Sequence, residues 1–299
     1  MSARVTVSIV IPMYHAVGVI AQTLRTALGQ TWTDREVIVI DDGSTDGSAA
    51  VAQSFGSQIR YYRFANGGVA KARNRGIALA RGRYIALLDH DDLWAPTKLA
   101  RQVDVLERRP EVGLVTTGIT HIELDGSPTP HAPTGPSSRF YQLFVRGFGP
   151  TPSTVMIRRS VLEQVGGFEE RFTSAGMDDH ELWPRLADVC EFALIDDPLT
   201  VHRGKIKEAQ DVGLWHRELL NQLLYDRYQH IPERRRYLLE ERAAYLSDMG
   251  KWYATHGEPE KGRALLTQSL RLTIREAWNV KTAVRTLRRL ARTAVMKDR

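Results

Sequence analysis

Two aspartates separated by one residue, Asp89 and Asp91, follow the apolar run at residues 84–88. Carboxylates held on a turn supply the hard oxygen ligands that Mg²⁺ or Mn²⁺ takes, and two of them leave coordination positions for phosphate oxygens. A metal ion there would neutralise a departing diphosphate. The alternative is that Asp89 and Asp92 cap a helix predicted over residues 96–107, because aspartate is a favoured N-cap residue. The triplet alone leaves both interpretations open.

A second acidic cluster, Asp-Asp-Gly-Ser-Thr-Asp-Gly, occupies residues 41–47. Its carboxylates, Asp42 among them, could accept hydrogen bonds from a base N–H or from ribose hydroxyls. Turn and N-cap chemistry recruits the same residue types, and both interpretations can hold for different members of the cluster. Pro12 and Tyr14 end the first apolar run. The Tyr14 ring could stack on a nucleobase there, although core packing is favoured for an isolated tyrosine.

A loop containing Gly67 and Gly68 leads into a predicted helix that carries Lys71 and Arg73. Backbone N–H groups and the helix dipole at such an N-terminus suit an anion, and the two cations would strengthen that preference. The alternative is that Lys71 and Arg73 belong to a solvated helix face.

The elements that would position these residues alternate between strand and helix. Apolar, β-branched runs predict strands at residues 5–11, 36–40, 59–64 and 84–88, with helical patterns between them at residues 19–28, 45–55 and 69–80. Parallel strands need crossover connections, so the alternation predicts a mostly parallel sheet with helices on both faces. Ligands bind beyond the carboxyl ends of such strands, which would bring both acidic clusters to one crevice.

Later segments are less regular. We expect a mobile loop at residues 126–138, which are rich in Pro, Gly and Ser, a strand at residues 155–157 and a helix at residues 179–187. Pro184 weakens the helix prediction, because an interior proline removes a hydrogen bond.

A change to continuous helical periodicity predicts one domain at residues 1–212 and an all-helical region at residues 213–299. Within that region, residues 245–272 fit either a generic helical hairpin or one tetratricopeptide-like unit. The generic hairpin is favoured, because one such unit does not make a solenoid.

The last predicted helix is basic and has an apolar stripe. Its cations are Lys281, Arg285, Arg288, Arg289, Arg292, Lys297 and Arg299, against the single acid Asp298, and its stripe comprises Val284, Leu287, Ala291, Ala294 and Val295. Such a helix could lie on an anionic membrane. The alternative, favoured by the small stripe residues and the lack of Trp or Phe anchors, is that the stripe packs on the rest of the domain.

Composition bounds the remaining possibilities. The chain has 299 residues, 42% of them hydrophobic, and a formal net charge of +6, which suits an anionic partner without identifying it. Cys190 is the single cysteine, so neither an intrachain disulfide nor a CxxC pair can form, and a reducing cytosolic setting fits best. The apolar run at residues 5–11 is too short for a signal peptide, and we expect any membrane attachment to be peripheral.

Four motifs taken in order resemble a known family. They are Ile-Val-Ile-Pro-Met-Tyr from residue 9, Val-Ile-Val-Ile-Asp-Asp-Gly-Ser-Thr-Asp-Gly from residue 37, Asn-Gly-Gly-Val-Ala-Lys-Ala-Arg-Asn-Arg-Gly-Ile from residue 66 and Tyr-Ile-Ala-Leu-Leu-Asp-His-Asp-Asp-Leu-Trp from residue 84. Together they look like the family 2 glycosyltransferases of the GT-A fold. The match is dense over residues 5–110 and thinner to about residue 205. The resemblance implies a nucleotide-sugar half at residues 1–110 and an acceptor half at residues 111–212.

The resemblance also implies roles for individual residues. It assigns the nucleotide-sugar site to Pro12, Tyr14, Asp42, Lys71, Arg73 and Asp89, the Mn²⁺ or Mg²⁺ site to Asp89 and Asp91, and the catalytic base to Asp179. His15, His90 and the Met177–Asp178 pair depart from the usual residues, but no key carboxylate is lost. His202 is expected at the surface rather than at the metal.

The implied activity is a single, inverting transfer of a sugar from a nucleotide diphosphate, with UDP as the expected nucleotide. The acceptor would be a hydroxyl of a carbohydrate or lipid-linked intermediate of bacterial surface polysaccharide, at a cytoplasmic location, with no nucleic acid as partner. One alternative is a sugar nucleotidyltransferase, which would carry a Gly-rich basic loop where residues 12–15 stand. The other is a non-catalytic nucleotide or glycan binder, against which the complete set of carboxylates argues.

Overall fold

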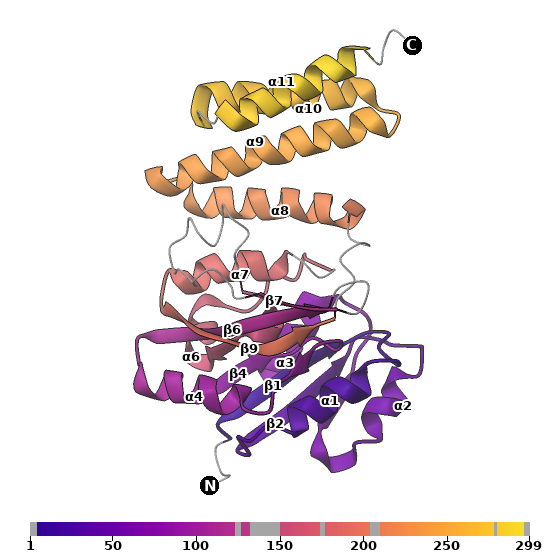
Figure 1. The fold of residues 1–299 in the computed structure, drawn as a ribbon, viewed down its shortest axis with the longest axis vertical. Helices are drawn as coiled ribbons and strands as arrows, with labels where there is room; N and C mark the ends of the chain where they lie inside the picture. Colours follow the sequence, from indigo (N-terminus) through magenta and orange to yellow (C-terminus); the bar gives the residue numbers. More distant parts are fainter. Residues whose placement is uncertain are drawn as a thin grey trace. The chain divides into compact units, whose positions relative to one another are not determined.

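The structure is a computed structural model that describes residues 5–122, 127–131, 150–173, 177–203, 210–277 and 280–295. The chain divides into two compact units, Met1–Glu208 and Ala209–Arg299, which we call the sheet unit and the helical unit (Figure 1). The α/β fold class expected from the sequence is confirmed, with a sheet in the first unit and helices in the second.

The sheet unit is built on nine strands in its described part. They are β1 (Val7–Met13), β2 (Arg35–Asp41), β3 (Arg60–Arg63), β4 (Tyr84–Leu87), β5 (Leu93–Trp94), β6 (Val112–Ile122), β7 (Pro128–His131), β8 (Met156–Arg158) and β9 (Glu191–His202). Their order is β3-β2-β1-β4-β8-β6-β9-β5, and β7 pairs with β6. The first four strands in this order are parallel, whereas β8 runs antiparallel to both of its neighbours.

Helices cover both faces of this sheet. They are α1 (Ile20–Leu28), α2 (Ser48–Gln53), α3 (Val69–Leu79), α4 (Lys98–Arg108), α6 (Arg159–Val165) and α7 (Asp178–Ala187), with 3-10 turns η1 (Gly56–Gln58) and η2 (Pro152–Thr154). Alternate residues of a strand point to opposite faces. Ile9 and Ile11 therefore share a core with α1 and α4, whereas a Cβ on Gly76 of α3 would meet Val10 Cγ1 at 2.3 Å from the opposite face.

Two features of this unit differ from the sequence predictions, and one prediction that a proline weakened is confirmed. Residues 128–131 lie in the predicted loop but form β7, while residues 126 and 132–138 of that prediction lie outside the described residues. The two longest strands, β6 and β9, were not predicted. The helix predicted at residues 179–187 is confirmed as α7, which continues through Pro184 because buried neighbours such as Leu182 and Leu186 anchor it on both sides of the proline.

The helical unit consists of α8 (Gln210–Tyr228), α9 (Pro232–Thr255), α10 (Pro259–Leu272), a π-turn η3 (Thr273–Ala277) and α11 (Val280–Val295). Helices α9 and α10 form a hairpin whose backbones approach closely at two glycines. A Cβ on Gly262 would lie 2.6 Å from the Gly250 carbonyl oxygen. Across the described residues, every helix is too short or too polar to cross a bilayer.

Candidate functional site

The carboxyl ends of β1, β2 and β4 border a cavity of about 520 Å³ in the sheet unit. Its lining comprises Pro12, Met13, Tyr14, Asp42, Asn66, Gly68, Val69, Ala72, Arg73, Asp89, His90, Asp91, Thr173 and His202. Parallel neighbouring strands bring their carboxyl ends to one edge, so the two acidic clusters meet there as the alternation predicted.

Six of the candidate residues line this cavity, namely Pro12, Tyr14, Asp42, Arg73, Asp89 and Asp91. Lys71 and Asp179 are not among the lining residues. Lys71 lies in the first turn of α3 and is half-buried. Its side chain lies beside Gly67 in the preceding loop, where a Cβ on Gly67 would meet Lys71 Cδ at 2.7 Å.

Tyr14 lies at the rim of the cavity rather than in the core. Its side chain is 44% exposed, and its ring stacks on His15 with 3.9 Å between centroids. The expectation that an isolated Tyr14 packs in the core is therefore wrong. His15 has a φ of 48°, so the backbone turns sharply after β1 and directs both rings outward.

Asp42 is buried and holds the glycine loop that precedes α3. Its Oδ2 accepts hydrogen bonds from the backbone N–H groups of Gly67 at 3.1 Å and Gly68 at 2.8 Å, and its Oδ1 pairs with Arg75 at 3.2 Å. Gly68 has a φ of +90° and a Cβ there would lie 2.4 Å from the Thr173 carbonyl oxygen. The loop therefore needs glycine on two counts.

The other aspartates of the 41–47 cluster have the turn chemistry that the sequence left as an alternative. Asp41 Oδ1 accepts the Ser44 N–H at 2.8 Å. Asp46 Oδ1 accepts the Ser48 N–H at 3.0 Å at the start of α2, and its hydrogen bonds to Ser48 lower the pKa of Asp46 to about 2. The turn interpretation is thus confirmed for Asp41 and Asp46, and nucleotide binding by Asp42 stays a prediction.

Arg73 is a buried cation that joins two distant acids. Its side chain is 2% exposed and bonds Asp89 through Nη2 at 2.6 Å and Asp178 through Nη1. Burial alone would lower the pKa of Arg73, but the charges of Asp89 and Asp178 raise it above its ordinary value. The solvated helix face considered for Arg73 is therefore wrong, and the residue links the end of β4 to the start of α7.

The turn after β4 is not a helix cap. Helix α4 begins at Lys98, and no side chain caps its N-terminus. Asp89 instead pairs with Arg73, and Asp92 Oδ1 accepts hydrogen bonds from His202 Nδ1 at 3.0 Å and from the Arg203 N–H at 3.2 Å. The capping interpretation of Asp89 and Asp92 is wrong.

His202 lies at the end of β9 and lines the cavity beside Asp89 and Asp91. Its hydrogen bond to Asp92 raises the pKa of His202 above the ordinary histidine value. The expectation of a surface histidine is therefore wrong. His202 is the last residue of β9, which the sequence did not predict, and its partner Asp92 lies 110 residues earlier in the chain.

Asp178 and Asp179 open α7 with different surroundings. Asp178 is fully buried, and its Oδ1 has no hydrogen-bond partner within the described part of the chain. Burial raises the pKa of Asp178 despite the opposing charge of Arg73. Asp179 keeps slightly more exposure, and its Oδ1 accepts the His180 N–H at 2.9 Å. Of the two, Asp178 is held in an ion pair with Arg73, whereas Asp179 accepts a hydrogen bond from a neighbouring backbone N–H.

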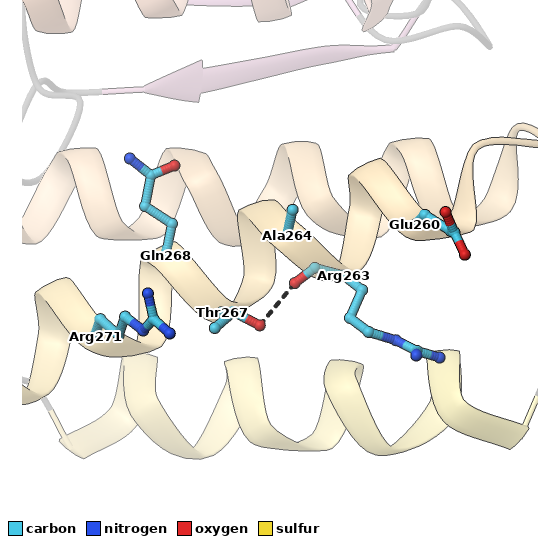
Figure 2. A pocket seen from close by; sticks show the side chains of 6 residues that line it. All are labelled: Glu260, Arg263, Ala264, Thr267, Gln268 and Arg271. Atoms are coloured by element: carbon cyan, nitrogen blue, oxygen red, sulfur yellow. Dashed lines mark hydrogen bonds between the residues drawn. The ribbon is translucent and has the colours of Figure 1, made fainter.

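A second hollow, of about 630 Å³, lies along α10 in the helical unit. Its lining comes from one helix, as Figure 2 shows: Glu260, Arg263, Ala264, Thr267, Gln268 and Arg271. The side chains spread along the helix, and Thr267 Oγ1 donates to the Arg263 carbonyl oxygen of the same helix at 2.8 Å. No set of polar groups converges there as in the sheet unit.

Comparison with known proteins gives matches in the part of the chain that forms the sheet unit and its cavity. Residues 8–166 match the family model described as Glycosyl transferase family 2, and residues 137–212 match the one described as Glycosyltransferase like family 2. A putative teichuronic acid biosynthesis glycosyltransferase, TuaG of Bacillus subtilis, is 33% identical over 53% of this chain and 64% of that protein. An uncharacterized glycosyltransferase of Rickettsia conorii is 41% identical over 34% of this chain but only 17% of its own length.

Two solved structures share the fold at low sequence identity. TarS 1–349 of S. aureus in complex with UDP-GlcNAc has a TM-score of 0.66 and 15% identity, covering 89% of this chain and 81% of that one. The mannosyltransferase PcManGT of Pyrobaculum calidifontis, in complex with GDP-Man and Mn²⁺, has a TM-score of 0.57 and 20% identity, covering 98% and 87%.

Proposed function

The chain belongs to glycosyl transferase family 2, and from that premise we propose that it transfers a sugar, with inversion, from a UDP-sugar to a hydroxyl acceptor. The observation that carries the proposal is the cavity at the carboxyl ends of β1, β2 and β4, where Asp89 and Asp91 face the lumen. Carboxylates at this edge are suited to a metal-bound diphosphate.

The residues present fit a divalent cation. Burial raises the pKa of Asp91, and its carboxylate has no partner in another residue among those described. Asp89 uses Oδ1 for Arg73, which leaves Oδ2 for a ligand. The described residues contain no cluster of three or more His, Cys, Asp or Glu arranged to hold a metal, so Mn²⁺ or Mg²⁺ would take its other oxygens from the diphosphate and water. When bound, it supplies charge neutralisation for the leaving group.

The donor would extend from the rim of the cavity to the acids. The exposed ring of Tyr14 offers a stacking surface for the base next to Pro12, and Asp42 fixes the glycine loop that lines the floor. Arg73 lies in the wall, where its fixed charge faces the sugar diphosphate. Lys71, outside the lining, is the weakest member of this set.

Asp179 is the proposed general base. Its carboxylate takes the proton of the acceptor hydroxyl as the acceptor oxygen bonds to the anomeric carbon. The bond from that carbon to the phosphate oxygen breaks, and its electron pair leaves with the diphosphate. One base suffices for this single displacement, which inverts the anomeric centre.

The donor and the acceptor are inferred from the relatives. TarS was solved with UDP-GlcNAc, which supports UDP over the GDP bound by the mannosyltransferase. The name of the Bacillus subtilis relative refers to teichuronic acid, which supports an acceptor in bacterial surface polysaccharide. We accordingly assign the enzyme to the cytoplasmic side of the membrane, in peripheral contact with it.

Nucleotide release from a panel of UDP- and GDP-sugars, with Mn²⁺ and without acceptor, tests the proposal. We expect release from a UDP-sugar, loss of release in EDTA and recovery on adding Mn²⁺. Asp91→Asn should abolish it, because the ion loses a ligand, whereas Asp104→Asn on exposed α4 should not. Full activity of Asp91→Asn in EDTA-treated buffer would remove the metal from the proposal, and release from GDP-sugars alone would replace the donor.

A further inference from the structure

Helix α11 buries two threonines, Thr282 and Thr286, and exposes several aliphatic residues on its outer side. Thr286 is fully buried, and its Oγ1 donates to Ser247 Oγ of α9 at 2.9 Å and lies 3.3 Å from Ser269 Oγ of α10. Arg289 pairs with Asp248 of α9 at 2.7 Å. The inner side of α11 therefore packs through hydroxyls and an ion pair, together with the half-buried Ala283 and Leu290.

The aliphatic residues are on the opposite side of the helix. Val284 is 41% exposed, Leu287 is 51% exposed, and Ala291 is exposed as well. Their spacing of three and four residues gives one continuous stripe. The expectation that this stripe packs on the rest of the domain is therefore wrong for its described members, while the side chains of residues 292–299 lie outside the described residues.

Cations run along one side of this stripe. Lys281 and Arg288 are exposed and lie within one turn of Val284, and Arg285 is exposed beside them. Helix α11 contains no acidic residue. Within the helical unit, α11 packs on α9 and α10 and lies on the side of α9 away from α8 (Figure 1). The outward face thus combines a narrow apolar stripe with the exposed cations Lys281 and Arg288, while Arg285 at its edge also interacts with Glu241 and Asp248 of α9.

We propose that this face, formed by Lys281, Val284, Leu287, Arg288 and Ala291, binds an anionic lipid surface. Acyl chains would cover the aliphatic stripe while the flanking cations contact headgroup phosphates and carboxylates, the usual arrangement of an interfacial helix. A second copy of the chain fits less well, because a two-fold contact would bring the same cations of both copies together. This inference rests on the proposed function in one respect: a lipid-linked acceptor would bring the enzyme to a membrane.

The strength expected of such a face is modest and depends on salt. A cation near an anionic leaflet contributes about fivefold to the partition coefficient, so Lys281 and Arg288 together give roughly 25-fold at low ionic strength. Burial of Leu287 adds roughly tenfold. Salt shortens the range of the electrostatic part, so binding should fall steeply as the salt concentration rises.

Flotation of the full chain with vesicles of phosphatidylcholine, with and without phosphatidylserine, tests the proposal. We expect flotation only with phosphatidylserine and at low salt. Leu287→Ser should reduce the bound fraction roughly tenfold, and the double variant Lys281→Ser/Arg288→Ser roughly 25-fold. Val189→Ser and Arg108→Ser are matched controls, since both side chains are exposed in the sheet unit, and neither should change binding.

Several outcomes would overturn the proposal. They are the absence of flotation at low salt, equal flotation with neutral vesicles, and unchanged flotation of the α11 variants. If sedimentation showed a dimer that Leu287→Ser dissociates, the face would be an interface between copies. Thermal melting should be the same for all variants, because the substituted side chains are exposed. Nucleotide release without acceptor is measured on the same samples, so a failure of the proposed activity is distinguishable from a failure of lipid binding.

Discussion

Each of the two units contains an arginine paired with aspartate, but the surroundings of the two pairs differ. In the sheet unit, the Arg73 side chain is 2% exposed between Asp89 and Asp178. In the helical unit, Arg289 is 20% exposed beside Asp248, which Arg217 also contacts at 3.0 Å. Water screens the second pair but hardly reaches the first, so removal of one partner leaves an uncompensated buried charge only in the sheet unit. The comparison shows that the buried pair of the sheet unit, Arg73 with Asp89, lies at the cavity of the candidate site, where water screens its charges least.

The largest effect is expected at the acids of the sheet unit. Asp179→Asn should reduce sugar transfer by roughly 10²–10⁴-fold, the usual contribution of general-base catalysis, with donor affinity nearly unchanged. Transfer kinetics and calorimetric titration with donor measure the two quantities. Asp188→Asn, an exposed aspartate at the other end of α7, is the control. Loss of donor binding in Asp179→Asn would assign this residue to the donor site instead.

Arg73→Met tests the buried pair itself. The substitution leaves Asp89 and Asp178 without their shared cation, so the free energy of unfolding should fall by about 3–5 kcal/mol. Arg289→Met in the helical unit should cost about 1 kcal/mol or less, because its pair is partly exposed. Urea unfolding of both variants gives the two values. Equal losses would contradict the comparison.

The close contact between α9 and α10 leaves no room for a side chain at Gly262 in the helical unit. Gly262→Ala would place a Cβ 2.6 Å from the Gly250 carbonyl oxygen and 2.7 Å from the Ala254 nitrogen. Overpacking of this kind costs about 1–3 kcal/mol, which thermal melting followed by circular dichroism would detect. Gly18→Ala is the matched control, since no heavy atom lies within 4 Å of a Cβ at that position. An unchanged melting temperature for Gly262→Ala would mean that the hairpin can separate without cost.

The smallest effect concerns pH. Burial would raise the pKa of Asp248, but the hydrogen bond from Arg289 and the charge of Arg217 lower it below its ordinary value. Because the folded pKa lies below the unfolded one, this stabilisation is present above the unfolded pKa, about 4, and is lost as the pH falls through the folded value. Asp248→Asn should therefore lose no more than about 1 kcal/mol at neutral pH and show a weaker loss of stability in acid than the unsubstituted chain. Identical acid profiles for the two proteins would contradict this assignment.

Local sequence patterns predicted the parts of the fold that depend on neighbouring residues. The runs at residues 5–11, 36–40 and 84–88 predicted three parallel strands, and their order along the chain predicted that the acidic residues after the second and third of them meet at one edge, where Asp42, Asp89 and Asp91 line the cavity. Strand alternation and crossover geometry suffice for this inference, because both are properties of short segments.

Partners distant in sequence could not be predicted in the same way. Arg73 meets Asp178 across 105 residues, and His202 meets Asp92 across 110. Nothing local distinguishes a cation held between two such acids from one in water, so Arg73 was also compatible with an exposed helix face. The sequence of α11 likewise predicted an apolar stripe but not which side of the helix packs against its neighbours. Thr286 and Arg289 determine that side through contacts with α9.

The separation of Arg73 from Asp178 also bears on the order of events during synthesis. Asp178 is made 105 residues after Arg73, a delay of about 5–20 s at the rate at which ribosomes extend a chain. Once Asp89 has been made, 16 residues after Arg73, it is the one of these two acids available to neutralise the guanidinium until Asp178 follows. The first four parallel strands can pair in the meantime, but the Arg73–Asp178 pair can form only after α7 has been made. A nascent chain stalled before α7 would therefore leave Arg73 without its Asp178 partner, whereas the end of β4 could already form its hydrogen bonds, from the Leu88 N–H to the Val10 carbonyl and from the Leu87 N–H to the Val155 carbonyl.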